Sequence, residues 1–294
     1  MRQHLEVVDS MSKRKIAWQH WRHFVQIFVI GYSFLCLLLY FQQQRLIFFP
    51  TRQLERTPSR YQLEYQDVWI AISTGEQVER LHGWWIPAKQ PDAPVMLYLH
   101  HNAINISANV SQALQFHKLG YSIFLFDYRG FGRSEGTFPT ESQVYEDAQA
   151  AWSYLVQERK ILPNQIMIYG HSVGGAIAID LAAKHPEAGA LIVQSSFTSL
   201  SDMTKQFGLY WLFPVEFLLR QRFESLEKMK SVGMPVLIIT GTEDLQIPVE
   251  MGKRLYEAAP EFKQFLVVQG GGHDNHLSSQ HRQLVEQFIE RAMH

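Results

Sequence analysis

The sequence contains a single cysteine, Cys36, so no disulfide can form within the chain. This absence rules out a disulfide framework but assigns no compartment, because such a chain is compatible with the cytosol and with an oxidising space. Net charge is also nearly absent, since 27 basic and 28 acidic residues give −1. A broad electrostatic surface for nucleic acid is therefore excluded, and no nucleic-acid partner is expected.

Neither an internal repeat nor a low-complexity tract interrupts the 294 residues. A single α/β domain commonly occupies roughly 200–250 residues. The length therefore fits one domain with a short additional segment better than it fits two domains.

Charged residues are missing from Phe24 to Phe41, where the sequence reads FVQIFVIGYSFLCLLLYF. At about 1.5 Å per residue, a helix of this length nearly spans a hydrocarbon core of about 30 Å. Trp18 and Trp21 precede the segment and Tyr40 lies near its end, as is typical of interfacial aromatic residues. The pattern predicts a membrane anchor.

A cleaved signal peptide and a buried core helix are the two alternatives for this segment. A signal peptide would end in small residues at a cleavage site, whereas bulky FQQQRLIFFP follows here. A core helix would belong to the domain that follows, whereas this segment lies outside it. Both alternatives are weaker than the anchor.

Basic residues flank the segment in nearly equal number, with Lys13, Arg14, Lys15 and Arg22 before it and Arg45, Arg52, Arg56 and Arg60 after it. A long folded domain is translocated largely regardless of its charge, so the cluster before the segment favours a cytoplasmic N-terminus. The catalytic domain is then expected on the non-cytoplasmic side, the periplasm in a bacterium. The expected organisation is a cytoplasmic segment at 1–23, a single-pass anchor at 24–41, a connector at 42–62 and a catalytic domain at 63–294.

Strand-like and helix-like stretches alternate after the connector. Short, almost continuous apolar runs are typical of strands buried on both faces of a parallel sheet, and helical spacing between them predicts helices that cover it. The expected strands are 68–72, 81–86, 95–100, 121–127, 165–170, 190–194, 236–240 and 264–268, the first two forming a hairpin that turns at Thr74-Gly75. The expected helices are 141–158, 173–184 and 251–259.

The stretch Thr204–Phe223 is rich in aromatic residues and lies between two expected strands. Such a crossover passes the carboxyl edge of the sheet, where ligands bind in α/β proteins. It fits an ordinary crossover helix and equally a small cap that lines a pocket with Phe207, Tyr210 and Trp211, because aromatic residues fill cores as readily as pockets.

The motif Gly170-His171-Ser172-Val173-Gly174 matches G-x-S-x-G between an apolar run and a helix of small residues. A nucleophilic serine needs such a sharp strand-to-helix turn, which exposes its Oγ. The helix N-terminus also places partial positive charge where an oxyanion would develop. We expect Ser172 to be a nucleophile.

A serine hydroxyl needs a base, and in this type of site the chain order is serine, acid, histidine. Asp244 follows a late apolar run, and His273 follows the last one after three glycines. Asp244 would orient and stabilise the charged imidazole of His273. Weaker candidates are Glu243 and Asp202 for the acid and His276 for the base.

An oxyanion would be bound by the amide of Val173 and by a second amide after the run VMLYLH, with Asn102 the expected donor. Histidines at 100–101 and 273–276 lack the spacing of a familiar zinc site, so neither a metal nor another cofactor is expected.

Several stretches resemble a known group. They are LIFFP (46–50), LYLHHNA (97–103), FDYRGFGRSEGTFPTE (126–141), YGHSVGG (169–175), SSFTSL (195–200), RFESLEKMKSVGMPVLIITGTEDLQIP (222–248) and GGGHDN (270–275). From Leu46 onward the chain resembles membrane-anchored α/β-hydrolase-domain proteins grouped with serine aminopeptidase-like hydrolases, which include protein depalmitoylases. The resemblance implies an α/β-hydrolase fold: a mostly parallel central sheet with helices on both faces, a small crossover cap and an N-terminal transmembrane helix. It also implies that Ser172, Asp244 and His273 are the triad.

The chain departs from the family in the loop after LYLH. Relatives usually have HGNAGN where this sequence has HHNAIN, so His101 and Ile104 replace two glycines and are expected to shape the substrate pocket. A β-branched Ile104 would be strained if its position required a positive φ.

The sequence therefore predicts a serine hydrolase of carboxylic esters or thioesters, acting on a small-molecule, acylated or lipid-like substrate. A peptidase is the first alternative, because the same triad cleaves amides. A non-catalytic membrane-bound scaffold is the second.

Overall fold

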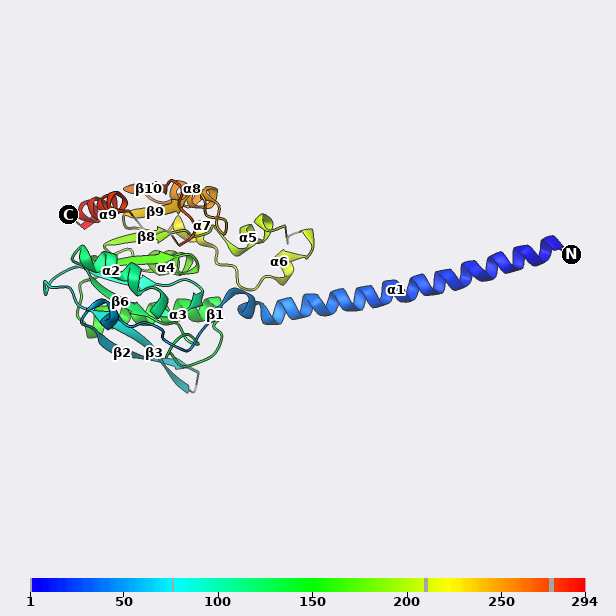
Figure 1. Ribbon diagram of the computed structural model, residues 1–294, viewed down its shortest axis with the longest axis horizontal. Coiled ribbons are helices and arrows are strands. Elements are labelled where there is room, and N and C mark those ends of the chain that lie inside the picture. The colour runs from blue at the N-terminus through cyan, green and yellow to red at the C-terminus, as the bar shows by residue number, and fades with distance from the viewer. Residues whose placement is uncertain (1, 76, 209–210, 275–277, 294) are drawn as a thin grey trace.

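The computed structural model describes residues 2–75, 77–208, 211–274 and 278–293. Its centre is an eight-stranded sheet, whose strands lie one above another in Figure 1. The strands follow the spatial order β10 (Lys263–Val268), β9 (Val236–Gly241), β8 (Ala190–Gln194), β7 (Ile166–His171), β4 (Val95–Leu99), β6 (Ser122–Phe126), β3 (Gln77–Ile86) and β2 (Gln66–Thr74). Strand β3 is antiparallel to β2 and β6, and all other neighbouring strands in this sheet are parallel. All eight expected strands and the hairpin are confirmed.

The central strands β4, β6, β7, β8 and β9 are buried along their whole length because both faces of the sheet are covered there. Leu97, Phe124 and Ile168 belong to the core on one face, packed with α3 and α4. Tyr98 and Tyr169 belong to the core on the other face, packed with α2 and α9. Alternate side chains of one strand enter opposite cores, as the two-residue period of a strand requires.

Three helices match the sequence expectation: α3 (Glu141–Ser153), α4 (Val173–Lys184) and α8 (Val249–Ala258). Thr140 begins α3 with a capping box, since its side chain accepts from the Gln143 amide while the Gln143 side chain accepts from the Thr140 amide. The last expected turn of this helix, Tyr154–Glu158, is a π-helix. Not predicted were α2 (Val110–Lys118) and α9 (Ser279–Met293).

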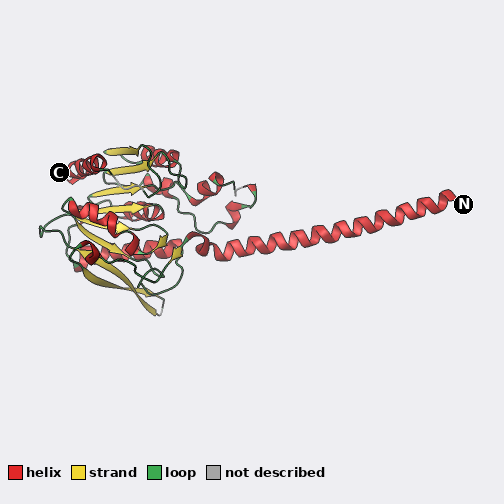
Figure 2. Cartoon of the chain, in the orientation of Figure 1, coloured by secondary structure: helices red, strands yellow, loops and turns green. Residues whose placement is uncertain are grey.

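Helix α1 (Arg2–Ile47) projects from the domain, as Figures 1 and 2 show. Its part Trp18–Ile47 is long and apolar enough to cross a membrane, and it contains an 18-residue window with a mean hydropathy of 2.2 in which no residue is buried. The helix continues past Phe41, so the start of the expected connector is helical.

The remainder of the expected connector packs against the loop that follows β4. Strand β1 (Phe49–Pro50) pairs in parallel with β5 (Ala103–Ile104), which lies in the loop after β4. A 3₁₀ turn at Pro58–Tyr61 follows β1. Through this pairing, the segment directly after α1 fixes the loop after β4, which lies at the carboxyl edge of the sheet.

The crossover between β8 and α7 (Ser225–Met229) is not one helix. It contains α5 (Leu200–Gln206) and α6 (Val215–Leu218), and we call residues 200–222 the cap. In Figure 1 the cap extends away from the sheet, towards the part of α1 that is nearest the domain. This arrangement agrees with a small cap and not with an ordinary crossover helix.

Candidate active site

Ser172 lies on the turn between β7 and α4, with φ 56° and ψ −123°. This backbone conformation is costly for a residue with a side chain, by about 1–3 kcal/mol, and is typical of functional sites whose surroundings enforce it. The Ser172 amide donates to the Gln194 carbonyl, and the Ser196 hydroxyl donates to the Ser172 carbonyl. The Ser172 side chain makes no capping hydrogen bond to α4, so its Oγ is not engaged by the helix.

Two glycines allow the chain to pack at this turn. A Cβ at Gly174 would overlap the carbonyl oxygens of Leu99 and His100 at the end of β4. A Cβ at Gly170 would overlap the backbone of Gly174 itself. The glycines therefore bring the start of α4 against the loop that follows β4.

Asp244 and His273 come together at the carboxyl ends of β9 and β10. His273 Nδ1 lies 2.8 Å from Asp244 Oδ2, and the Asp244 side chain is fully buried. The other oxygen, Oδ1, accepts from the amides of Gln246 at 2.9 Å and Ile247 at 2.8 Å. Burial alone would raise the pKa of the Asp244 carboxyl, but these hydrogen bonds hold it below its usual value.

The loop that carries His273 contacts the residue next to Ser172. His171 Nε2 lies 3.0 Å from the His273 carbonyl oxygen, and their rings are 5.1 Å apart. Since the carbonyl can only accept, the His171 ring donates from Nε2. Ser172 and the Asp244–His273 pair thus lie at one edge of the sheet.

The weaker candidates are placed elsewhere or fall outside the description. Glu243 is exposed, and Asp202 is bound by Thr198 and Arg254 at the base of the cap. His276 lies outside the described residues. Among the described carboxylates considered, Asp244 is the one bonded to His273.

The two amides expected to bind an oxyanion, those of Asn102 and Val173, donate to no acceptor within the described part of the chain. Asn102 is held from its other groups. Its carbonyl accepts from the Phe49 amide at 2.8 Å, and its side chain donates to the Ile47 carbonyl at 2.5 Å. The end of α1 therefore positions the Asn102 loop.

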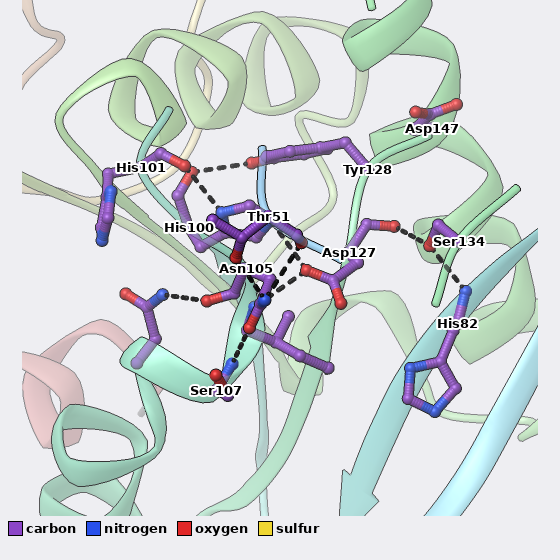
Figure 3. A network of polar contacts seen from close by, with 12 residues as sticks. Thr51, His82, His100, His101, Asn105, Ser107, Asp127, Tyr128, Ser134 and Asp147 are labelled. Carbon is purple, nitrogen blue, oxygen red and sulfur yellow. Dashed lines mark hydrogen bonds and ion pairs between the residues drawn. The ribbon is translucent and has the colours of Figure 1, made fainter. Parts of the chain in front are cut away.

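A buried polar network supports this loop from beneath (Figure 3). Asp127 Oδ1 accepts from the Ile106 amide at 2.8 Å, and the Asn105 side chain donates to Thr51 Oγ1 at 2.8 Å. Ser134 joins the Asp127 carbonyl to β3, through the His82 amide. These contacts join the loop that carries Asn102 to the segment after α1 and to β3, and so hold it in place.

Ile104 has φ 62°, so this position does require the left-handed conformation. A β-branched side chain is strained there, as expected for an isoleucine in place of the usual glycine. His101 does not share this conformation; its half-buried ring packs edge-on against His171 at 5.7 Å and accepts from the Ala103 amide. Burial lowers the pKa of His101, which favours the neutral ring.

We expect Ile104→Gly to leave the unfolding free energy within about 1 kcal/mol of wild type, although it removes a large side chain. Ile104 is 39% exposed, so more than half of its side chain is buried and its loss costs on the order of 1 kcal/mol. Relief of a left-handed conformation with a Cβ, worth about 1–2 kcal/mol, offsets this loss and the extra chain entropy of glycine. Thermal unfolding of the full chain in detergent should therefore shift by less than about 4 °C. Val78→Gly, an exposed position in β3, should lower the midpoint without such relief, and a larger fall for Ile104→Gly than for Val78→Gly would contradict the strain.

Acid should destabilise the fold through two buried histidines. Burial lowers the pKa of His100 to about 3 and that of His171 to about 4. Because both values lie below the unfolded value of about 6.5, the unfolded chain takes up protons that the folded chain does not. Their contribution is complete above pH 6.5 and is lost as the pH falls towards 4.

Urea unfolding of the full chain between pH 7 and pH 4.5 measures this effect. We expect His171→Gln to reduce the pH dependence of the unfolding free energy by about one proton, since only one titrating group is removed. An unchanged slope would show that His171 titrates normally.

A cavity of about 530 Å³ adjoins Ser172 and is lined mainly by apolar residues, including Phe197 and Ile247 from the loops after β8 and β9. The site contributes Asn102, Ser172 and Val173; the cap contributes Phe207 and several aliphatic residues; and α1 contributes Leu39, Gln43, Leu46 and Ile47. None of the described lining residues is charged. The volume falls in the usual range for small-molecule sites, roughly 300–1,000 Å³.

The structure brings only part of the expected lining to this cavity. Phe207 lines it, whereas Trp211 is 87% exposed and His101 and Ile104 are not among the lining residues. Tyr210 lies outside the described residues. The α1 wall was missed, because an anchor is predicted from hydropathy alone and nothing in that signal places it beside the site.

Within the described ranges, no three histidine, cysteine, aspartate or glutamate side chains gather closely enough to hold a metal ion.

Comparison with known proteins places the chain among hydrolases. Residues 94–223 match the family described as serine aminopeptidase, S33. An uncharacterized Mycobacterium tuberculosis protein is 35% identical over 85% of this chain and 87% of its own. The α/β hydrolase domain-containing protein WAV2 of Arabidopsis thaliana is 31% identical over 74% of this chain and 75% of its own.

Solved structures share the fold at lower identity. The Pyrococcus furiosus esterase Pf2001 superimposes with a TM-score of 0.68 at 23% identity, covering 84% of this chain and 98% of the esterase. An α/β hydrolase from Vibrio vulnificus gives a TM-score of 0.61 at 23% identity, over 88% of this chain and 91% of its own.

Proposed function

Since this chain belongs to the α/β-hydrolase family, with a serine aminopeptidase S33 signature, we propose that it is a membrane-anchored serine hydrolase that cleaves esters or thioesters of lipid-like acyl groups. The observation that carries this proposal is the uncharged apolar cavity beside Ser172. An acyl chain gains free energy by leaving water for such a cavity. A residue of the anchor helix, Leu39, contributes to the same wall.

In the proposed reaction, Ser172 Oγ attacks the acyl carbonyl carbon while His273 Nε2 takes the hydroxyl proton. His273 Nδ1 donates to Asp244, which holds the ring in the required tautomer and stabilises the imidazolium. The carbonyl oxygen becomes an oxyanion, bound by the amides of Val173 and Asn102.

Collapse of this intermediate breaks the bond to the leaving alcohol or thiol, which takes the proton from His273 and departs. The acyl group remains on Ser172. Water then attacks the acyl-enzyme, gives one proton to His273, and releases the carboxylic acid as Ser172 recovers its proton. The reaction consumes one water and needs no other reactant.

A serine peptidase is the second candidate, favoured by the family description. An aminopeptidase must bind the substrate's ammonium group, which requires a carboxylate or several carbonyl acceptors. The described lining of the cavity offers no carboxylate. The ester and thioester reading therefore fits the cavity better.

We place the membrane anchor within α1, with residues 1–23 on the cytoplasmic side and the catalytic domain on the other. The domain begins earlier than residue 63, because Phe49 and Thr51 hold the Asn102 loop. A catalytic fragment for study should therefore retain β1 and the end of α1.

The proposal is tested with the full chain in detergent, using p-nitrophenyl esters of increasing acyl length, an aminoacyl p-nitroanilide and a fluorophosphonate probe. We expect labelling on the peptide that contains Ser172, and a kcat/KM that rises with acyl length. Faster cleavage of the nitroanilide would favour the peptidase. A folded chain that is neither labelled nor active would favour a non-catalytic scaffold.

A further inference from the structure

The cap is fixed to α1 at two levels of the helix. At the lower level, Gln43 makes four hydrogen bonds: its amide nitrogen donates to the Tyr40 and Leu218 carbonyls, and its oxygen accepts from the Arg220 and Gln221 amides. Gln43 is only 7% exposed. A buried, fully bonded amide ties the cap firmly to the helix.

The second contact is made by Tyr32, which lies further from the domain along α1 than Gln43 does. The Tyr32 hydroxyl donates to the Leu212 carbonyl at 2.9 Å, and the Tyr32 ring stacks on Phe213 with centroids 6.0 Å apart. Tyr32 precedes Ile47 by 15 residues, which corresponds to about 22 Å along an α-helix. The tip of the cap therefore contacts α1 about 22 Å from the end of the helix that joins the domain.

This distance fixes the depth of the cap if α1 crosses a membrane. A span needs about 20 residues, and every such window within Trp18–Ile47 contains Tyr32. The contacts of Tyr32 with the cap would therefore lie inside the hydrocarbon layer, wherever the span begins.

The surface of the cap matches that location. Large apolar side chains are exposed on it: Phe207 at 56%, Trp211 at 87%, Leu212 at 63% and Phe217 at 86%. Between Gln206 and Leu219 the sequence has one charged residue, Glu216, whose carboxylate accepts from the Ser201 hydroxyl and lies 4.0 Å from Arg222. An exposed apolar surface with so little charge is typical of membrane-inserted segments.

Positive charge gathers where the cap meets the domain. The Arg220 guanidinium lies 5.2 Å from the Tyr40 ring centroid, and Arg45 lies 5.0 Å from that of Phe138. Arginine and aromatic residues at such a level are typical of the membrane interface, where the arginine heads reach the lipid phosphates.

We propose that the cap is embedded in the leaflet beside α1, so that the acyl chain of a membrane lipid ester reaches Ser172 directly from the hydrocarbon layer. The cavity is lined by α1 residues such as Leu39 and by cap residues such as Phe213, so one apolar wall joins leaflet and site. The substrate part of this inference rests on the proposed hydrolase function, whereas the insertion of the cap does not.

Insertion is tested in the full chain, reconstituted in phosphatidylcholine–phosphatidylglycerol nanodiscs, in a Cys36→Ser background. An environment-sensitive fluorophore is attached at Phe217→Cys and, as a control, at Leu162→Cys. Leu162 is also exposed, at 59%, but lies before β7 at the opposite edge of the sheet. We expect lipids with a nitroxide on the acyl chain to quench the Phe217→Cys label and not the Leu162→Cys label. Equal quenching of the two would overturn the proposal.

Lateral entry is tested by Phe217→Glu, since Phe217 does not line the cavity. We expect kcat/KM to fall at least tenfold for a long-chain ester embedded in vesicles and to be unchanged for a short, water-soluble ester. Leu162→Glu should change neither value. Equal rates of Phe217→Glu and wild type on the embedded ester would overturn lateral entry. A wild-type protein that cleaves neither ester would overturn the hydrolase function, while the quenching result would still decide insertion.

Discussion

Ser172→Ala should abolish ester hydrolysis, lowering kcat by a factor on the order of 10⁶, the loss known for removal of the nucleophile of another serine hydrolase. The physical reason is that His171 and Val173, the neighbours of Ser172 at the turn between β7 and α4, carry no hydroxyl that could replace it as the nucleophile. Helix α4 begins at this turn, with the free amides of its first turn directed at the site. The substitution removes one hydroxyl from a side chain that caps nothing, so the fold should be retained. The measurements are kcat on a p-nitrophenyl ester, covalent labelling by a fluorophosphonate, and thermal unfolding.

Ser195→Ala is the matched control for this substitution. Ser195 directly follows the neighbouring strand β8, is buried, and its hydroxyl has no hydrogen-bond partner within the described residues. Loss of a hydroxyl that bonds nothing should leave both activity and stability nearly unchanged. If Ser172→Ala kept its activity while Ser195→Ala lost it, the nucleophile would lie in the loop after β8.

The central strands could be predicted because a sheet covered on both faces demands apolar residues at nearly every position, and this signal survives without knowledge of the partners. The hairpin of β2 and β3 was instead indicated by two strand-like runs joined by a turn at Thr74-Gly75. The turn at Ser172 was also accessible from sequence, since the closeness of β7, α4 and β4 needs glycine at fixed positions around the nucleophile. The pairing of Asp244 with His273 followed from chain order, because parallel strands bring their carboxyl ends to one edge.

What the sequence could not provide were contacts that depend on tertiary packing alone. Strands β1 and β5 have two residues each, too short for any period, yet they fasten the Asn102 loop to the end of α1. The aromatic composition of the cap did not reveal that Phe207 would face the cavity while Trp211 faced outward, because both residues suit either surface. The hydropathy of α1 likewise predicted a span but not a wall of the cavity.

Asp244→Asn should lower kcat by about 10⁴-fold with little change in stability. The asparagine oxygen will take the place of Asp244 Oδ1, because the amides of Gln246 and Ile247 both need an acceptor there. Its NH₂ group then points at His273 Nδ1 and donates to it. The imidazole proton is forced onto Nε2, the atom that must accept the Ser172 proton, so the base is in the wrong tautomer.

Glu243→Gln separates this tautomer effect from a general loss of negative charge. Glu243 is adjacent in sequence and exposed, so the variant removes the same charge a single residue away from the imidazole partner. We expect it to retain near wild-type kcat, while Asp244→Asn retains the wild-type unfolding midpoint and still reacts, slowly, with a fluorophosphonate. Full activity in Asp244→Asn together with loss in Glu243→Gln would reassign the acid. A loss of folding in Asp244→Asn would instead mean that the two amide bonds accepted by Oδ1 hold the β9 loop in place, a structural role distinct from orienting His273.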